Sequence, residues 1–98
     1  MYEIFYIKGF EEPWWMFEGW EKDIVEKKTF DDLEKAHAYF EDMAKVLAEK
    51  FSSQKSAGQG AIAFWNDGDL AFCEDCEENL QIYHGLLWIC NKKPIKSF

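Results

Sequence analysis

The chain contains no arginine. Its basic side chains are 11 lysines, set against 19 aspartates and glutamates, so the net charge is -8 at pH 7. Proteins gain most of their affinity for DNA by neutralising phosphates with lysine and arginine, and arginine is also the preferred side chain for reading guanine. The charge balance therefore disfavours direct binding to duplex DNA.

Long apolar runs are also missing. No segment reaches the roughly 18 consecutive apolar residues that a transmembrane helix needs. The first residues, Met1–Ile4, lack the basic flank of a secretory signal peptide. We therefore expect no membrane association and a cytoplasmic location, where the three cysteines stay reduced.

The chain is nevertheless rich in core-forming side chains. Of its 98 residues, 48% are apolar and 18% are aromatic. Disordered chains lack aromatic residues, and a chain of this length has room for one hydrophobic core rather than two. We expect a single folded domain over residues 1–98, with a flexible internal loop at 52–60, where serine, glycine and glutamine dominate.

Residues 31–50 give the clearest helical pattern. Asp31 is the expected N-cap, with Glu34 as its capping-box partner, and Thr29 with Asp32 is the alternative cap. Apolar side chains then recur at helical spacing and predict one buried stripe. These are Leu33, Ala36, Phe40, Met43, Ala44, Leu47 and Phe51.

Extended segments surround this helix. Aromatic and β-branched residues predict strands at 2–8, 23–28, 61–65, 70–73 and 80–90, and an irregular strand or folded loop at 14–20. The run Asn66–Asp69 predicts a hairpin turn between the strands 61–65 and 70–73. One helix provides few parallel crossovers, so the sheet should be mostly antiparallel, with the helix on one face. The sequence thus predicts an α+β domain.

Two cysteines at Cys-x-x-Cys spacing offer three interpretations. Cys73 and Cys76 suggest a redox pair, but the surrounding acids raise thiol pKa values and disfavour the reactive thiolate. A zinc site needs four ligands, and His84 and Cys90 lie too far apart on one straight strand for both to join. The favoured interpretation is two small, partly buried side chains. We therefore expect no enzyme and no cofactor, with zinc or thiol chemistry at Cys73, Cys76 and His84 as the alternative.

His84 also fits a structural interpretation. Period-two alternation from residue 80 to residue 90 places it on an apolar strand face with Leu86 and Trp88. A histidine in that position is expected to be a hydrogen-bonded residue at the edge of the core.

Two groups of residues are candidates for partner binding. Four aromatic residues are too many for a single helix to bury, and exposed tryptophans are typical anchors in protein interfaces. They are Trp14, Trp15, Phe17 and Trp20. Six acids without an intervening lysine form the second group and are suited to steering a basic partner. They are Asp67, Asp69, Glu74, Asp75, Glu77 and Glu78.

Several motifs resemble those of one known family. They are Pro13-Trp14-Trp15, Glu18-Gly19-Trp20, Ala63-Phe64-Trp65, Cys73-Glu74 with Cys76, and Tyr83-His84-Gly85. In their combined order over residues 1–95, the chain resembles domain-of-unknown-function family 1033, small proteins of low-GC Gram-positive bacteria. Members are often labelled DNA-binding proteins, so the resemblance implies nucleic-acid association as a competing hypothesis. The family has no established activity from which a catalytic residue is transferred.

The leading hypothesis is a non-enzymatic protein-interaction module with a basic protein partner. The aromatic group at Trp14–Trp20 would supply the anchors, and the acidic segment Asp67–Glu78 would supply electrostatic attraction. The sequence carries no signal for the oligomeric state.

Overall fold

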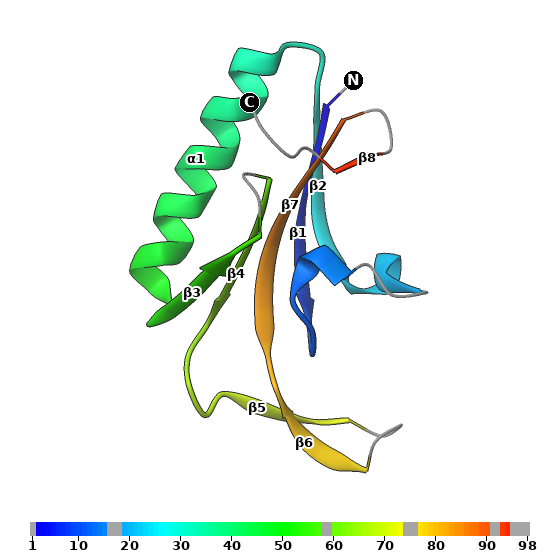
Figure 1. Cartoon of the computed structure of the whole chain (residues 1–98), viewed down its shortest axis with the longest axis vertical. Coiled ribbons are helices and arrows are strands. Elements are labelled where there is room, and N and C mark those ends of the chain that lie inside the picture. The colour runs from blue at the N-terminus through cyan, green and yellow to red at the C-terminus, as the bar shows by residue number, and fades with distance from the viewer. Residues whose placement is uncertain (1, 16–18, 58–59, 74–76, 91–92, 95–98) are drawn as a thin grey trace.

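The described strands form two antiparallel sheets. The computed structural model describes residues 2–15, 19–57, 60–73, 77–90 and 93–94. In chain order the elements are β1 (Tyr2–Gly9), η1 (Pro13–Trp15), η2 (Trp20–Asp23), β2 (Ile24–Phe30), α1 (Leu33–Lys50), β3 (Ser53–Ser56), β4 (Ala61–Trp65), β5 (Leu70–Cys73), β6 (Glu78–Gln81), β7 (Tyr83–Cys90) and β8 (Lys93–Pro94). All strand pairs between them are antiparallel, and α1 is the main helix (Figure 1). The predicted α+β class is confirmed.

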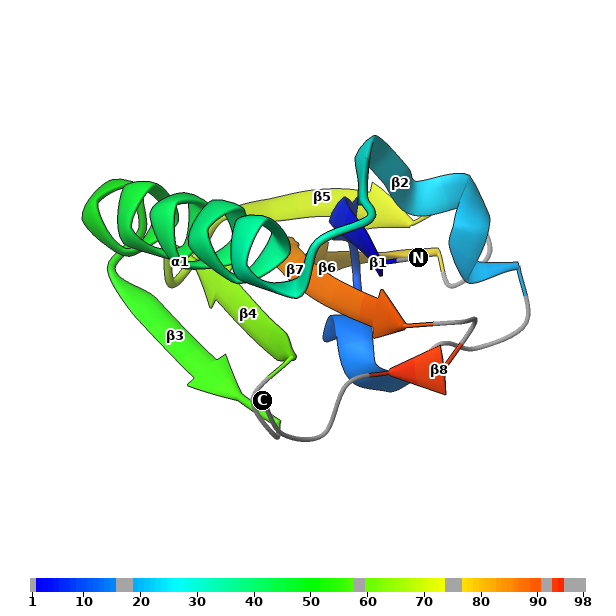
Figure 2. The ribbon, with the colours of Figure 1, turned by 90° about the horizontal axis from the view of Figure 1, so that it is seen from above.

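The larger sheet has β1 and β7 at its centre. Its strand order is β2-β1-β7-β4-β3, and the short strand β8 pairs with the end of β7. Helix α1 lies over one face, and the segment containing η1 lies on the opposite face (Figure 2). Because both faces are covered, β7 is buried from His84 to Ile89.

The face under α1 holds the larger core cluster. Ile4 from β1, Phe64 from β4, and Leu86 and Trp88 from β7 alternate toward the helix, as period-two geometry requires. Helix α1 contributes the buried part of the predicted stripe, which consists of Ala36, Phe40 and Leu47, followed by Phe51.

The start of α1 differs from the prediction. Asp32, and not Asp31, is the N-cap, and its side chain accepts a hydrogen bond from the Glu34 backbone N–H at 2.8 Å. The helix therefore begins at Leu33, whose side chain is 42% exposed although the periodic pattern placed it in the stripe. Leu33 is the first residue of the helix, and the buried part of the stripe begins one turn later, at Ala36. No helix among the described residues has the length and apolar character needed to cross a membrane.

The opposite face carries the second core cluster. Phe5, Ile7, Leu87 and Ile89 point away from α1, together with Ala61. The segment predicted as an irregular strand or folded loop at 14–20 supplies part of their cover: residues 13–15 form the 3₁₀ turn η1, and residues 16–18 lie outside the described residues. This segment therefore completes the core.

The second half of the chain corrects three predictions. Residues 53–56, expected within a flexible loop at 52–60, form β3 and pair with β4. The segment 70–73 does not return along β4; it pairs with β6 in a separate two-stranded sheet. The predicted strand 80–90 is interrupted at Ile82 and divides into β6 and β7.

A mismatch in spacing explains the second and third corrections, which concern the segments 70–73 and 80–90. Phe64 pairs with His84 and Leu70 pairs with Gln81, so one strand advances six residues while the other retreats three. The extra residues form the turn Asn66–Asp69, which closes with the Asp69 N–H donating to the Asn66 carbonyl at 3.0 Å. The Gln81 side-chain amide donates to the carbonyls of Asn66 and Asp69 at 2.9 and 3.1 Å and fixes this bend.

Candidate interaction surface on the β5–β6 arm

The bend at Asn66–Asp69 directs β5 and β6 away from the main sheet. We call the two-stranded sheet formed by β5 and β6 the arm. The arm projects from the end of the main sheet at which the chain leaves β4 and later enters β7 (Figure 1). Isolated two-stranded sheets are marginally stable in water, so the arm depends on its attachment to the main sheet.

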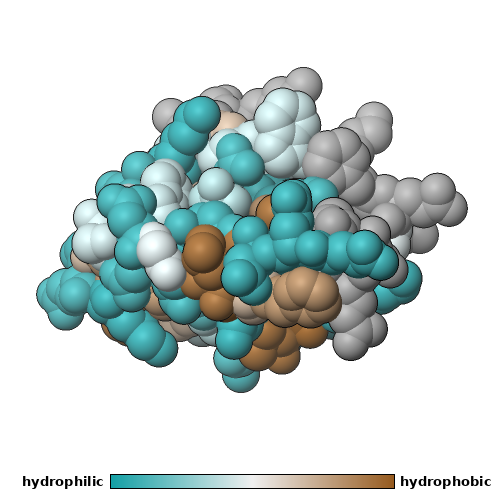
Figure 3. Space-filling model, turned by 90° about the horizontal axis from the view of Figure 1, so that it is seen from below, coloured by the Kyte–Doolittle hydropathy of each residue, from teal (hydrophilic) through white to brown (hydrophobic). Residues whose placement is uncertain are grey.

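Two large apolar side chains on the arm are exposed to solvent. Leu70 is 51% exposed and Phe72 is 59% exposed. Both lie on one face of the arm, because they are two residues apart on β5. Viewed from the end that carries the arm, the molecule shows apolar side chains gathered between hydrophilic ones (Figure 3).

Sequence reasoning missed Leu70 and Phe72. It predicted segment 70–73 as the return strand of a hairpin with strand 61–65 and gave its apolar side chains no functional role. A signal was available in the alternation of Leu70 and Phe72 directly after a strong turn and directly before the acids. Alternation predicts that the two side chains share a face, but it does not say what covers that face.

Several acids of the predicted group lie on the arm or in the turns at its two ends. Asp67, Asp69, Glu77 and Glu78 are exposed, whereas Glu74 and Asp75 lie outside the described residues. No lysine or arginine occurs in the sequence between Lys55 and Lys92, so this stretch supplies no local counter-charge. Asp67 has an internal role as well, since its Oδ1 accepts a hydrogen bond from Trp65 Nε1 at 3.0 Å.

The four aromatic candidates do not form one exposed patch. Trp14 and Trp20 pack against the second core cluster, and the Trp20 ring meets Phe5 edge-on with centroids 5.6 Å apart. Trp15 is 55% exposed, and Phe17 lies outside the described residues. Two of the predicted anchors therefore contribute to the core, and Trp15 is the described member that presents most of its surface.

The candidate zinc or thiol site is described only in part. The Cys73 backbone pairs with Glu78 at the outer end of the arm, whereas His84 lies in the core-facing part of β7. The side chain of Cys73 and all of Cys76 lie outside the described part of the structure. Across the described ranges, no three His, Cys, Asp or Glu side chains gather as metal ligands would.

His84 occupies the structural position predicted for it. Its ring stacks on Phe51 with centroids 4.3 Å apart, and its Nδ1 lies 2.6 Å from the Tyr6 hydroxyl. Burial lowers the pKa of His84, as do the charges of Lys8 and Lys50, while Asp69 raises it. The His84 imidazole is therefore neutral at pH 7. Burial raises the pKa of Tyr6, so its hydroxyl keeps its proton and can donate a hydrogen bond to the His84 ring.

This environment predicts a pH-dependent stability. Because the folded-state pKa of His84 lies below its ordinary value of 6.5, the unfolded chain binds more protons as the pH falls past that value. Stability is therefore fully present above about pH 6.5 and decreases as the pH falls through the lower folded-state pKa. Urea unfolding of the wild type and of His84→Gln across this range measures the effect. We expect a weaker pH dependence in the variant; identical slopes would contradict the assignment to His84.

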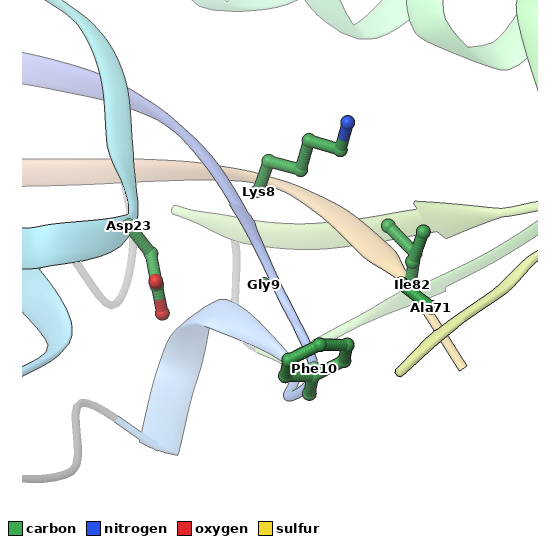
Figure 4. A pocket seen from close by; sticks show the side chains of 6 residues that line it. All are labelled: Lys8, Gly9, Phe10, Asp23, Ala71 and Ile82. Atoms are coloured by element: carbon green, nitrogen blue, oxygen red, sulfur yellow. The ribbon is translucent and has the colours of Figure 1, made fainter. Parts of the chain in front are cut away.

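A cavity lies where the arm meets the main sheet. Its volume is about 220 Å³, and it is lined by Lys8, Gly9, Phe10, Asp23, Ala71 and Ile82. Lys8 and Asp23 extend to opposite sides of β1, whereas Phe10 lies at the same end as Ala71 and Ile82 (Figure 4). The Asp23 carboxylate sits so close to Gly9 that a Cβ there would lie 2.7 Å from its Oδ2. Residues of the arm and of β1 therefore line the same cavity.

Comparison with known protein families gives a match over almost the whole chain. The model of the family described as protein of unknown function (DUF1033) matches residues 1–97. No curated protein and no solved structure matches the chain.

Proposed function

Because the chain belongs to the DUF1033 family, whose function is unknown, we propose a function from the geometry of its surface. The protein is a cytoplasmic protein-interaction module without enzymatic activity. Its arm is the docking surface, and its partner is a basic protein.

The observation that carries this proposal is the exposure of Leu70 and Phe72 on a projecting sheet. Single exposed apolar residues are common on protein surfaces. Leu70 and Phe72, however, are two large apolar side chains on the same face of a two-stranded sheet, and neither belongs to a core cluster. Aromatic side chains in such positions supply much of the binding energy of protein interfaces. The patch therefore gains stability when a partner covers it.

The negative charge of the arm and its adjoining turns supports a basic partner. Asp67, Asp69, Glu77 and Glu78 create a negative field that accelerates the approach of a positively charged surface. The same field repels the phosphates of nucleic acids. In addition, Lys27 and Lys28 on β2 each lie 3.7 Å from a glutamate, at Glu3 and Glu26, which reduces their attraction for phosphate. These contacts favour a protein partner over nucleic-acid association.

The aromatic group has a narrower role in this proposal. Trp14 and Trp20 support the core, whereas Trp15, with more than half of its surface exposed, supplies an additional contact. It lies in η1, which packs against β4 and β7 on the face away from α1.

Replacing both Leu70 and Phe72 with serine is expected to abolish partner capture while leaving the fold intact. Neither side chain belongs to the two core clusters, so the free energy of unfolding should change by less than about 1 kcal/mol. The measurement is cross-linking capture from cell extract, quantified by mass spectrometry, together with urea unfolding of the purified variant.

A matched control uses two other exposed apolar residues. Val25 on β2 and Val46 on α1 are 59% and 56% exposed, and neither lies on the arm. Their double replacement with serine should leave capture unchanged. Equal loss of capture in both double variants, or full capture by the Leu70 and Phe72 variant, would contradict the arm as the docking surface.

A further inference from the structure

We propose that the partner binds by strand addition: an extended segment carrying lysine or arginine pairs with the outer edge of β5. This inference rests on the proposed function and specifies how the arm performs it. It follows from the hydrogen-bond pattern of the arm, from the character of its edge and from the distribution of charge on its faces.

The hydrogen-bond pattern sets the direction of the β5 backbone groups. The Ile82 N–H donates to the Asp69 carbonyl at 2.9 Å, which makes residues 69 and 82 a hydrogen-bonded pair. Hydrogen-bonded and non-hydrogen-bonded pairs alternate along antiparallel strands. Leu70 and Phe72, paired with Gln81 and Asn79, are therefore non-hydrogen-bonded pairs. Their N–H and C=O groups point outward, to the edge of β5 that faces away from β6.

This outer edge has no strand beside it in the described ranges, where the second sheet consists of β5 and β6 alone. The outward N–H and C=O groups of Leu70 and Phe72 lie next to the exposed side chains of the same two residues. A strand added at this edge therefore forms main-chain hydrogen bonds and also contacts the side chains of Leu70 and Phe72. Extended peptides bind to open sheet edges in this way.

The edges of the main sheet differ from this one. Strand β2 carries Lys27 and Lys28, and β3 carries Lys55. Lysines on edge strands are a common protection against unwanted pairing. Strand β5 has the sequence Leu-Ala-Phe-Cys and carries no charged side chain. Strand β6, the other edge of the arm, carries Glu78. Of the edge strands β2, β3, β5 and β6, β5 is therefore the one whose sequence favours the addition of a strand.

The charges on the arm indicate which kind of segment binds at the edge of β5. Alternation along the strands places Asp69 and Glu78 on the face opposite to Leu70 and Phe72. A matching segment alternates apolar side chains, which cover Leu70 and Phe72, with basic side chains on the acidic face. A second copy of this chain carries a net charge of -8 and would bring like charges together. A basic segment of a different protein is the occupant that the charges favour.

The test uses an end-capped synthetic peptide in which lysine and valine alternate. Two variants of the full chain are compared: Phe72→Ala removes the side chain, and Phe72→Pro removes the side chain and the outward N–H. Because that N–H does not pair with β6, the arm should stay paired, and slow exchange of the Ile82 amide proton verifies this. Loss of one main-chain hydrogen bond should weaken peptide binding by about three- to tenfold in Phe72→Pro relative to Phe72→Ala.

The peptide provides a second, independent comparison. Methylating the backbone nitrogens along one edge of the peptide keeps its charge and side chains but removes donors, so it should bind at least about tenfold more weakly. Replacing its lysines with glutamates should abolish binding. On strand addition, the amides of Leu70 and Phe72 should gain protection from hydrogen exchange.

The outcomes separate this inference from the proposed function. Equal affinities of Phe72→Pro and Phe72→Ala, with unchanged binding of the methylated peptide, would overturn strand addition and leave side-chain docking in place. Unchanged affinity in Phe72→Ala would remove the arm from the interface and overturn both. A dimer of the chain that protects the same two amides and excludes the peptide would replace the basic segment with a second copy as the occupant.

Discussion

Replacing Trp88 with alanine is expected to destabilise the protein by about 3–5 kcal/mol, a large part of the roughly 5–15 kcal/mol that stabilises a typical domain. The Trp88 side chain on β7 is fully buried. Rings from β1 and α1 pack against it: Tyr2 meets it edge-on with centroids 6.3 Å apart, His37 stacks on it at 5.9 Å, and Phe40 lies at 5.6 Å. Alanine would leave a cavity that connects β1, β7 and α1.

Urea unfolding followed by circular dichroism measures this effect. The control is Trp15→Ala, which makes the same chemical change at a side chain that is 55% exposed. Because exposed positions tolerate substitution, we expect a change within about 0.5 kcal/mol for the control. Similar losses at both positions would show that Trp88 is not the centre of the core.

Replacing Gly85 with alanine is expected to destabilise the protein by about 1–3 kcal/mol, although only one methyl group is added. Gly85 lies in β7, and a Cβ at this position would be 2.7 Å from both Cβ and Cγ of Pro13. The clash is with a rigid ring rather than with the end of a flexible side chain. The added methyl group therefore displaces η1 from the sheet, and with it the cover provided by Trp14.

A double-mutant cycle tests this explanation of the Gly85 effect. Pro13→Gly removes the atoms that the new methyl group would meet. If the clash causes the loss, adding Gly85→Ala to Pro13→Gly should cost less than adding it to the wild type, with a coupling energy of about 1 kcal/mol or more. Additive effects would show that the glycine is required for a different reason.

These stability variants and the arm variants separate folding from function. Trp88 and Gly85 belong to the layers that hold the domain together, whereas Leu70 and Phe72 belong to neither core cluster. Trp88→Ala and Gly85→Ala should reduce partner capture only in proportion to the unfolded fraction. The arm variants should reduce capture in a fully folded protein.

The main sheet and helix were largely predictable because their signals are local. Apolar residues at helical spacing predicted α1, and period-two alternation placed His84, Leu86 and Trp88 on one face of β7. The capping residue was predicted one position too early, because Asp31 and Asp32 are chemically equivalent caps. Their difference depends on where the chain leaves β2, which no local pattern specifies.

The arm was not predictable from the same signals. The residues Leu70–Cys73 have strand character whether they pair with β4 or with β6, and the turn Asn66–Asp69 is compatible with both. The choice depends on the register between β4 and β7 and on the bend that the Gln81 amide fixes, which are contacts between residues distant in sequence. The exposure of Leu70 and Phe72 follows from that choice.

The sequence by itself determined the acidic charge, the antiparallel α+β architecture, the family membership and the helix that covers one face. These properties depend on composition, on order and on periodicity within short segments. Only the tertiary structure decided which aromatic residues complete the core and which apolar residues remain exposed. The physical reason is that the burial of a side chain depends on which distant residues pack against it. Trp14 and Trp20 pack onto the sheet, whereas Leu70 and Phe72 stay uncovered.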